Sequence, residues 1–407
     1  SPQGYRKEKV KIKLTKRGPV ISGILSGLET GKVLTVRWSP FENMGATLGV
    51  DKLLRARSVN DIREALRHVN MIVLNFVFAD KDGNFGWLVS GRFPIRSQGG
   101  GTIPYAVKDG KDNWIGWIPF DEKPQRFKPE RGWIGTCNHK TVGKDYPYYY
   151  SSQFGSSYRY RRVKELLQTP GKKSVNDHWE FQRDTLNLMA KKIAPVMARV
   201  LLENEDTQDM GKILSNWNFR DDADQSAPAI FQAVYRNFAT LVFQDELGGD
   251  LTSKMLSSWY FWQERLGEMV RQGSSTWFDN VETKDTVETM DMLFYQAAVD
   301  AKAQLTSRLG KNPDNWRWGR LHRLELVSPI RRKGFGKGIL GGGSHPAPGS
   351  GETLYRGRYS FHAPFAVTVA ASLRMVVDLG NDEKVLAVLP GGACGRLFHR
   401  HTKDQIQ

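Results

Sequence analysis

Alternating and continuous apolar runs dominate the first 165 residues of the chain. They predict strands over residues 9–14, 32–38, 72–78, 85–89 and 133–137. A polar turn at residues 81–84 joins the third and fourth strands into a hairpin. Because the first strand of that hairpin is almost entirely apolar, we expect it to be covered on both faces. The pattern therefore predicts a buried sheet with helices against it.

One early segment has helical spacing instead. Ile62, Leu66 and Val69 are three or four residues apart, and they follow Ser58 and Asn60, which are typical helix caps. This spacing predicts a single helix among the strands of the first part.

A longer helical region follows, from residue 170 to about residue 303. Ser174 or Asn176 can cap its first helix, and Pro195 can kink it. The apolar side of this helix is formed by Trp179, Leu186, Met189, Ile193, Met197, Val200 and Leu201. The same period predicts helices over residues 227–247 and 286–305.

Strand patterns return in the final part of the chain. They predict strands over residues 324–327, 366–378 and 384–389, and a long surface loop over residues 334–351, which are rich in Gly, Ser and Pro. We expect one domain built from three parts. These are a first part of the core (residues 1–169), a helical segment (residues 170–305) and a return to the core sheet (residues 306–407).

Composition describes a well-packed globular protein with many turns. The chain is 40% hydrophobic and holds 12 Trp, with 18 Pro and 40 Gly spread along it. No run of 18 apolar residues occurs, so no membrane span is expected. Cys137 and Cys394 are too few for a disulfide framework and could form one bridge or remain two thiols.

The chain is strongly basic, with a formal net charge of +16. Such a charge allows a polyanion as a partner. The basic residues are scattered in small groups, however, and no zinc-finger, RNP or P-loop pattern accompanies them. We therefore expect a solvated basic face and no nucleic acid.

The most informative segment is residues 133–138, Trp-Ile-Gly-Thr-Cys-Asn. An apolar strand that ends on a small residue and an Asn can aim a neutral amide at a reacting carbonyl. An Asn N–H held rigidly in a dry site is a good oxyanion donor, because it meets developing negative charge without a proton that can be lost. Arg159 follows 21 residues after Asn138, at the end of an aromatic, Ser-rich loop that opens a helix. No nucleophile accompanies this pair in the sequence.

Other polar motifs have simpler interpretations. Residues 334–338 are Gly-rich but lack the spacing and the Ser/Thr of a P-loop. His399 and His401 have no further ligand at metal-binding spacing, which favours a solvated terminal segment. We expect His322 to be a packing residue. The acidic group Asp221, Asp222 and Asp224 is expected in a loop.

A resemblance to a known family emerges from many motifs in a fixed order. Residues 78–87, Phe-Ala-Asp-Lys-Asp-Gly-Asn-Phe-Gly-Trp, followed by Gly91, Pro94 and Arg96, resemble the signature hairpin of the penicillin acylase (penicillin amidase) family of N-terminal nucleophile hydrolases. Further segments resemble that family in the same order: residues 17–21, 116–120 and 132–138, Gln182 with Asp184, and residues 316–322 and 389–392. The resemblance runs nearly from end to end.

The resemblance implies a fold and an activity. The fold is α+β, a four-layered αββα sandwich with a helical insertion, here incomplete at both ends. The activity is hydrolysis of N-acyl amides, of the penicillin type or the N-acyl-homoserine-lactone type. In the family an autoproteolytically freed N-terminal Ser uses its own α-amine as base, and Asn138 and Arg159 match the oxyanion-hole residue and the orienting arginine. The resemblance also implies a periplasmic or secreted protein, a link to antibiotic biosynthesis and no required cofactor.

Departures from the family pattern carry expectations too. About seventeen residues precede Gly18, and Ser1 is followed by Pro2, so we expect the nucleophile on a segment missing from this fragment. The expected partners are the α-chain and the N-terminal β-chain segment of the same precursor, together with a small N-acyl amide. Tyr148 to Tyr150 stand where some members supply an acidic ligand to a structural calcium, so the metal ligands stay unassigned. The chain by itself is expected to be inactive.

A second hypothesis is a non-catalytic relative or basic protein that binds polyanions. It predicts Lys and Arg clustered on an open face and an affinity that falls steeply with salt. The enzyme hypothesis instead predicts that the Asn138 amide and the Arg159 guanidinium converge.

Overall fold

The computed structural model describes residues 4–5, 7–24, 31–45, 48–107, 113–258, 262–327, 341–381, 385–396 and 398–406. It divides into two compact units. The first unit comprises Ser1–Ile134 and Thr141–Ser152, and the second comprises Gly135–Lys140 and Gln153–Gln407.

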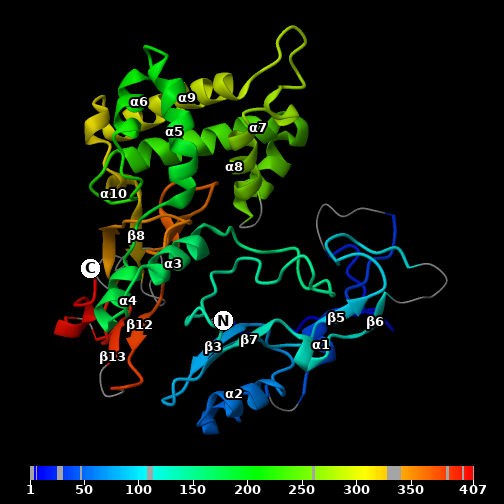
Figure 1. Cartoon of the computed structure of the whole chain (residues 1–407). Coiled ribbons are helices and arrows are strands. Elements are labelled where there is room, and N and C mark those ends of the chain that lie inside the picture. Colours follow the sequence, from blue (N-terminus) through cyan, green and yellow to red (C-terminus); the bar gives the residue numbers. More distant parts are fainter. Residues whose placement is uncertain are drawn as a thin grey trace. The chain divides into compact units, whose positions relative to one another are not determined.

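The first unit is built from short strands and helices. They are β1 (Leu14–Thr15), β2 (Gly18–Pro19), α1 (Ser39–Glu42), η1 (Leu53–Arg55), α2 (Val59–Leu66), β3 (Asn75–Ala79), β4 (Phe85–Val89), β5 (Pro94–Arg96), β6 (Trp114–Trp117), η2 (Phe120–Glu122) and β7 (Gln125–Phe127). The antiparallel sheet β3-β4-β7 is the largest sheet among the described residues, and α2 packs against it (Figure 1).

The hairpin expected in the first part is present as β3 and β4, with Phe78 opposite Gly86. The expectation that its first strand is covered on both faces is wrong. Residues of β3 alternate between exposed and half-buried, whereas most of β4 is buried. The reason is position, since β3 lies at the edge of the sheet and β4 in its middle.

Two other expected strands are shorter than the pattern implied. Residues 9–14 contribute little more than the start of β1, and residues 32–38 contain one isolated bridge, between Val20 and Thr35. Residues 133–137 form no strand, which corrects the prediction for the segment that leads to Asn138.

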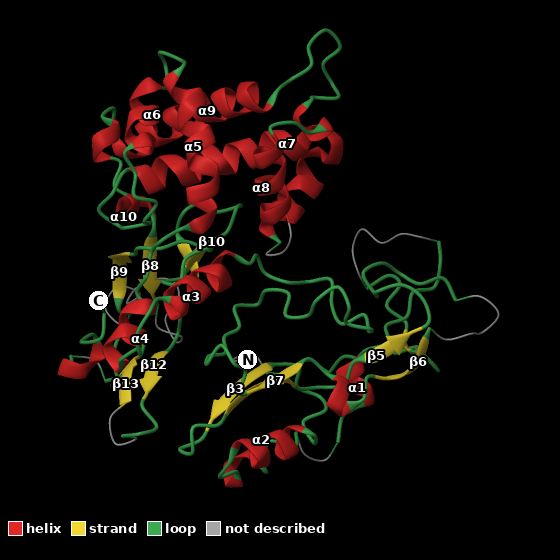
Figure 2. Ribbon diagram, viewed as in Figure 1, coloured by secondary structure: helices red, strands yellow, loops and turns green. Residues whose placement is uncertain are grey.

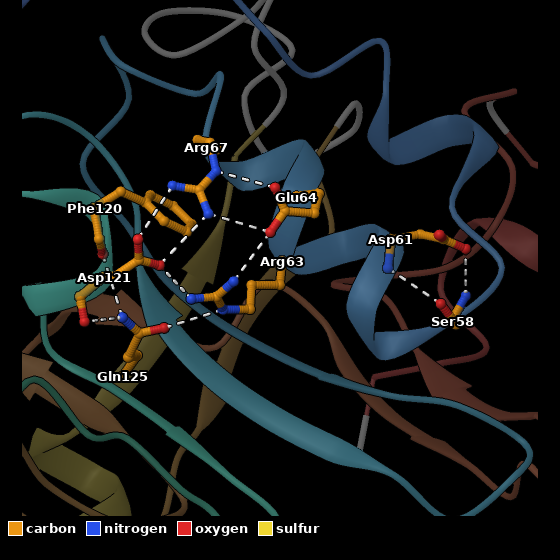
Figure 3. A network of polar contacts seen from close by, with 8 residues as sticks. All are labelled: Ser58, Asp61, Arg63, Glu64, Arg67, Phe120, Asp121 and Gln125. Carbon is orange, nitrogen blue, oxygen red and sulfur yellow. Dashed lines mark hydrogen bonds and ion pairs between the residues drawn. The ribbon is translucent and has the colours of Figure 1, made fainter.

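The N-terminus of helix α2 is fixed by side chains close to it in the sequence. Ser58 Oγ accepts a hydrogen bond from Asp61 N at 3.1 Å, and the Asp61 carboxylate accepts one from Ser58 N at 3.0 Å. These reciprocal bonds form a capping box, so Ser58 rather than Asn60 is the cap (Figure 3). Hydrogen bonds from the backbone N–H groups of Arg57 and Ser58 and from the Ser58 hydroxyl lower the pKa of Asp61.

Basic residues on α2 are neutralised by nearby acids. Arg63 and Arg67 both pair with Glu64 and with Asp121 of η2, and Arg67 lies 4.1 Å from the centre of the Phe120 ring (Figure 3). This part of the basic surface therefore carries ion pairs and not an array of unpaired cations.

The second unit holds most of the helices. They are α3 (Tyr158–Gln168), α4 (Val175–Phe181), α5 (Leu188–Leu202), α6 (Gln208–Ser215), α7 (Ala227–Ser257), α8 (Trp262–Gln272), η3 (Thr276–Phe278), α9 (Met290–Leu309), η4 (Pro313–Asn315), α10 (Trp318–Leu321) and η5 (Arg400–Thr402). The large core lies among α5, α7 and α9 (Figure 2). Within this core the rings of Phe238 and Phe294 stack with centres 3.9 Å apart.

The helical region departs from the predicted boundaries in one important place. The single long helix expected after Ser174 is two helices, α4 capped by Ser174 and α5 capped by Asn187. The turn between them carries Asp184, whose buried carboxylate binds Arg162 of α3. Helix α7 is longer than predicted and bends at Gly248, where φ is 69°. Helix α9 has the predicted length but begins and ends four residues later than predicted.

The strands of the second unit pair two by two. They are β8 (Arg323–Leu326), β9 (Gly343–Pro346), β10 (Gly357–Tyr359), β11 (Val367–Ala370), β12 (Arg374–Val377) and β13 (Val385–Val388), paired antiparallel as β8-β9, β10-β11 and β12-β13.

Two predictions for this part need correction. Residues 366–378 form two strands instead of one, and the predicted surface loop contains β9, which pairs with β8. Residues 334–340 of that loop lie outside the described residues. Among the described helices, none combines the length and apolarity that crossing a membrane requires.

Candidate functional site

Asn138 lies in a sharp bend of the backbone within the second unit. Its φ of 63° is in the left-handed region, which Asn tolerates better than most residues. Its backbone oxygen accepts a hydrogen bond from Gly155 N at 2.6 Å. A Cβ at Gly155 would lie 3.3 Å from Asn138 Cβ, so a glycine at this position allows the two segments to approach. The loop before α3 therefore fixes the backbone at Asn138.

Arg159, the second residue of α3, sets the orientation of the Asn138 carboxamide. Its Nη2 donates to Asn138 Oδ1 at 3.0 Å and to Cys137 O at 2.8 Å. Because a guanidinium can only donate, its partner is the amide oxygen and the Nδ2 group points elsewhere as a donor. Within the described part of the chain, Asn138 Nδ2 makes no hydrogen bond.

A ring stack reinforces this pairing. His139 and Tyr160, the neighbours of Asn138 and Arg159, lie face to face with centres 3.7 Å apart and an interplanar angle of 13°. Asn138 and His139 thus contact Arg159 and Tyr160, respectively. These two contacts restrict rotation of the carboxamide relative to α3.

The exposure of the site differs from the sequence-based expectation. Asn138 is exposed to solvent and Arg159 is half-buried, whereas we expected the amide in a dry site. Cys137 is half-buried beneath them, and burial raises the pKa of its thiol. Water in contact with the carboxamide would weaken its effect on a developing charge.

The two arginines that follow Arg159 have acidic partners. Arg162 forms a two-point contact with Asp184, at 3.0 and 2.8 Å, and Arg161 lies 3.6 Å from Glu264. Of the three arginines at the start of α3, Arg159 is therefore the one in contact with Asn138.

A cavity of about 340 Å³ opens beside this pair. It is lined by Cys137, Arg159, Val163, Leu166, Leu167, His178, Phe181, Gln182, Leu354, Ala371, Leu373 and Arg374. They lie on α3, on or directly after α4, in the loop before Tyr355, and at or just before the start of β12, while Cys137 precedes Asn138. The lining is largely apolar and includes no Asp or Glu. Such a cavity suits a small ligand with an apolar body.

Glu352 is a residue that the sequence analysis missed. It is 4% exposed, and its carboxylate accepts a hydrogen bond from the Ser156 hydroxyl in the loop before α3. Burial raises its pKa, while the charges of Arg159 and Arg356 oppose that shift. Residues 156 and 352 are 196 positions apart, so no local pattern could have signalled the contact.

The remaining candidates have structural explanations. His322 is buried and stacks on Trp318 with ring centres 4.4 Å apart, and burial lowers its pKa to about 4, which confirms the packing interpretation. His401 pairs with Asp404, Cys137 and Cys394 are two free thiols, and residues 334–338 lie outside the described residues. Across the described ranges, no three His, Cys, Asp or Glu residues gather as metal ligands.

Asp221 lies in the expected loop but is fully buried, where Asn187 Nδ2 donates to its Oδ2 at 2.9 Å. Burial raises its pKa from the ordinary 3.8 to about 7. The folded state therefore holds this proton to higher pH than the unfolded state does, so the stability contributed by the neutral acid is lost as pH rises from about 4 to about 7.

We expect Asp221→Asn to gain stability relative to the wild type over this pH range, because the amide is neutral throughout and can still accept from Asn187. Urea unfolding of both proteins at pH 5 and pH 8 measures the difference. A difference in the free energy of unfolding that is equal at the two pH values would contradict the expectation.

Comparison with known protein families shows which family the chain belongs to. The model of the Penicillin amidase family matches residues 2–407. The chain belongs to this family. The resemblance seen in the sequence is thereby confirmed.

Individual penicillin amidase relatives are distant but align over almost the whole chain. Acyl-homoserine lactone acylase QuiP of Pseudomonas aeruginosa is 26% identical over 451 residues, which cover 99% of this chain and 52% of that protein. Penicillin acylase 2 proenzyme of a Pseudomonas species is 26% identical over 396 residues, covering 96% and 50%. The chain spans about half the length of these curated relatives.

A solved structure shares the fold. The thermostable penicillin G acylase from Alcaligenes faecalis matches with a TM-score of 0.65 and 17% identity, over 99% of this chain and 74% of that one. Together with the mixture of helices and short sheets, this match confirms the predicted α+β fold of the penicillin acylase type.

Proposed function

We propose that the whole protein hydrolyses N-acyl amides to a carboxylic acid and an amine, and that Asn138 supplies the side-chain half of its oxyanion hole. The observation that carries this proposal is the 3.0 Å contact from Arg159 Nη2 to Asn138 Oδ1. That contact fixes the Asn138 amide by its oxygen, so the Nδ2 hydrogens can donate to a substrate oxygen. The names of the acylase relatives support the reaction class.

In the proposed mechanism a serine oxygen attacks the substrate carbonyl, and Asn138 Nδ2 donates to the oxygen that becomes negative. Arg159 acts through Asn138, because it holds the amide oxygen and its positive charge polarises the N–H groups. An α-amine has an unperturbed pKa of about 7.7–8.0, so the amine of an N-terminal Ser can take the hydroxyl proton near neutral pH.

We further propose that the nucleophilic Ser belongs to a segment other than this chain, in a precursor that cuts itself. The half-length match to the acylase relatives supports this proposal. A segment that carries the Ser would also cover the exposed Asn138 and exclude water from it. The α-chain and the N-terminal β-chain segment stay the predicted partners, and periplasmic or secreted localisation stays a prediction.

The 407-residue chain is therefore expected to show no turnover of a chromogenic N-acyl amide, whereas the whole protein turns it over. A colorimetric assay of both measures this. Turnover by the isolated chain that disappears in Ser1→Ala would place the nucleophile at Ser1 and overturn the proposed division of the site. Absence of turnover by the whole protein on penicillin-type and acyl-homoserine-lactone-type amides would overturn the reaction class.

The polyanion hypothesis has less support. Arg63 and Arg67 of α2 are engaged with acids, and Arg159 contacts Asn138, which is the convergence that the enzyme hypothesis predicts. We therefore favour the enzyme. A structural calcium ion stays untested and its ligands stay unassigned, and Tyr148 to Tyr150 offer it no carboxylate.

A further inference from the structure

A small cavity lies inside the second unit, between the helical segment and the loop that carries Glu352. Its volume is about 30 Å³. Helices α5, α7 and α8, residues 350–352 and β10 all contribute side chains to its wall. None of its lining residues lines the larger cavity beside Arg159, and nothing in the proposed oxyanion chemistry uses it. Its content is therefore a separate question.

Two buried side chains of α7 bring polar atoms without a partner to this cavity. Gln232 is 3% exposed and Tyr235 is 1% exposed. The Tyr359 hydroxyl donates to Gln232 Oε1 at 3.0 Å, which engages the acceptor of this amide, but its Nε2 donor has no hydrogen-bond partner in the described chain. The Tyr235 hydroxyl has none either. Burial raises the pKa of this hydroxyl, and the nearby Tyr158 and Glu352 raise it further. Because Glu352 lines the same cavity, this proximity indicates that the Tyr235 hydroxyl lies on the cavity side of its ring.

The wall also carries an acceptor and charges of both signs. Gln263 of α8 contributes an Oε1 atom that is covered from solvent and has no partner among the described residues. Arg358 and Glu352 line the cavity as well, with Arg358 donating to Ser257 O at 3.0 Å and Glu352 accepting from Ser156. A cation would meet the guanidinium and an anion would meet the carboxylate. The cavity therefore suits a neutral ligand.

The unpartnered atoms define what that ligand does. It accepts from Gln232 Nε2, donates to Gln263 Oε1, and does either with the Tyr235 hydroxyl. Water is the smallest neutral molecule with both abilities, and buried polar groups that lack a protein partner commonly bind it. One water needs roughly 10–15 Å³ of such a cavity, so the volume of about 30 Å³ accommodates about two.

We propose that this cavity is a binding site for about two water molecules, which join Gln232 and Tyr235 of α7 to Gln263 of α8. The waters supply the hydrogen bonds that these three side chains do not make with the protein. They also lie against residues 350–352, so they are part of the packing between the helical segment and the loop that carries Glu352.

A crystal structure of the wild-type chain, at a resolution that shows ordered water, tests the site without any variant. We expect density for bound water within about 2.7–3.2 Å of Gln232 Nε2, the Tyr235 hydroxyl and Gln263 Oε1. A cavity without such density, or the three atoms bonded directly to one another, would overturn the proposal.

Tyr235→Phe gives a second test, because the sign of its effect depends on the water. If the hydroxyl is hydrogen-bonded to water, its removal should lower the ratio of folded to unfolded chain by about three- to tenfold. If the hydroxyl has no partner, its removal relieves the cost of a buried unsatisfied group, and the ratio should rise. Urea unfolding measures the ratio. A rise would contradict the proposed site.

Tyr158→Phe is the matched control. Tyr158 of α3 is also 1% exposed, and its hydroxyl has no hydrogen-bond partner within the described ranges. It does not line the cavity, and a Cβ at Gly267 would lie only 2.9 Å from its oxygen, so α8 packs closely against it. We expect Tyr158→Phe to leave the folded-to-unfolded ratio unchanged or to raise it. An equal fall in both variants would show that the loss in Tyr235→Phe does not come from water in this cavity.

Discussion

Asn138→Gly is expected to lower kcat/KM of the whole protein for an N-acyl amide by about 10²–10³-fold, the usual loss when one oxyanion donor is removed. Glycine is the informative replacement because the backbone at Asn138 has a φ of 63°, which glycine adopts without strain. The change thus removes the carboxamide and leaves the bend. Steady-state kinetics on a chromogenic amide measures the loss.

Asn138→Ala provides the control for backbone strain. Alanine also lacks the carboxamide, so Asn138→Ala should lose the same activity. Because alanine disfavours the left-handed bend, the free energy of unfolding of Asn138→Ala should also fall by about 1 kcal/mol. If Asn138→Gly keeps wild-type activity while Asn138→Ala loses it, the bend matters and the carboxamide does not. That result would reject the proposed role of Asn138.

Arg162→Ala is expected to destabilise the chain by about 1.5–3 kcal/mol, because it removes the two charged hydrogen bonds to the buried Asp184 carboxylate and leaves Arg220, 3.7 Å away, as its cation. The side chains of Arg162 and Asp184 are 18% and 9% exposed, and their two-point contact ties α3 to the turn between α4 and α5. Urea unfolding followed by circular dichroism measures the change in the free energy of unfolding.

Arg183→Ala is the comparison for this prediction. The Arg183–Glu180 pair is 49% and 64% exposed, so its loss should cost about 1 kcal/mol or less. Similar losses in the free energy of unfolding of the two variants would show that burial does not strengthen the Arg162–Asp184 pair. The activity of the whole protein should fall with Arg162→Ala if the position of α3, and with it Arg159, depends on this pair.

Local sequence patterns predicted the elements that depend on local interactions. The cap at Ser58 requires only Asp61 three residues later, and both the helix and its start are found. Ser174 caps α4 in the same way. The hairpin around residues 81–84 is present because its turn residues adjoin both strands.

Patterns failed where the structure depends on distant partners. Residues 133–137 are apolar enough for a strand, but the backbone turns at Gly132 and Asn138, where φ is 75° and 63°, and no strand pairs with them. Apolarity predicts burial and does not predict a hydrogen-bonding partner. Strand β3 shows the same difficulty, because its apolar run occupies an edge.

The residues of the candidate site also differ in whether the sequence could predict them. Asn138 and Arg159 could be singled out from motif and resemblance, and they are hydrogen-bonded in the structure, although their catalytic role stays a prediction. Glu352 could not, since the loop that carries it reaches the site from about two hundred residues further along the chain. Its contribution depends on tertiary packing that no spacing in the sequence encodes.

The most direct test of the central claim is a crystal structure of the whole protein with an alkyl boronic acid bound to its nucleophile. The tetrahedral boronate places an oxygen where the oxyanion forms. We predict Asn138 Nδ2 at about 2.7–3.1 Å from that oxygen, with Arg159 still donating to Asn138 Oδ1. A boronate oxygen held by other donors, with the Asn138 carboxamide turned away from it, would contradict the claim.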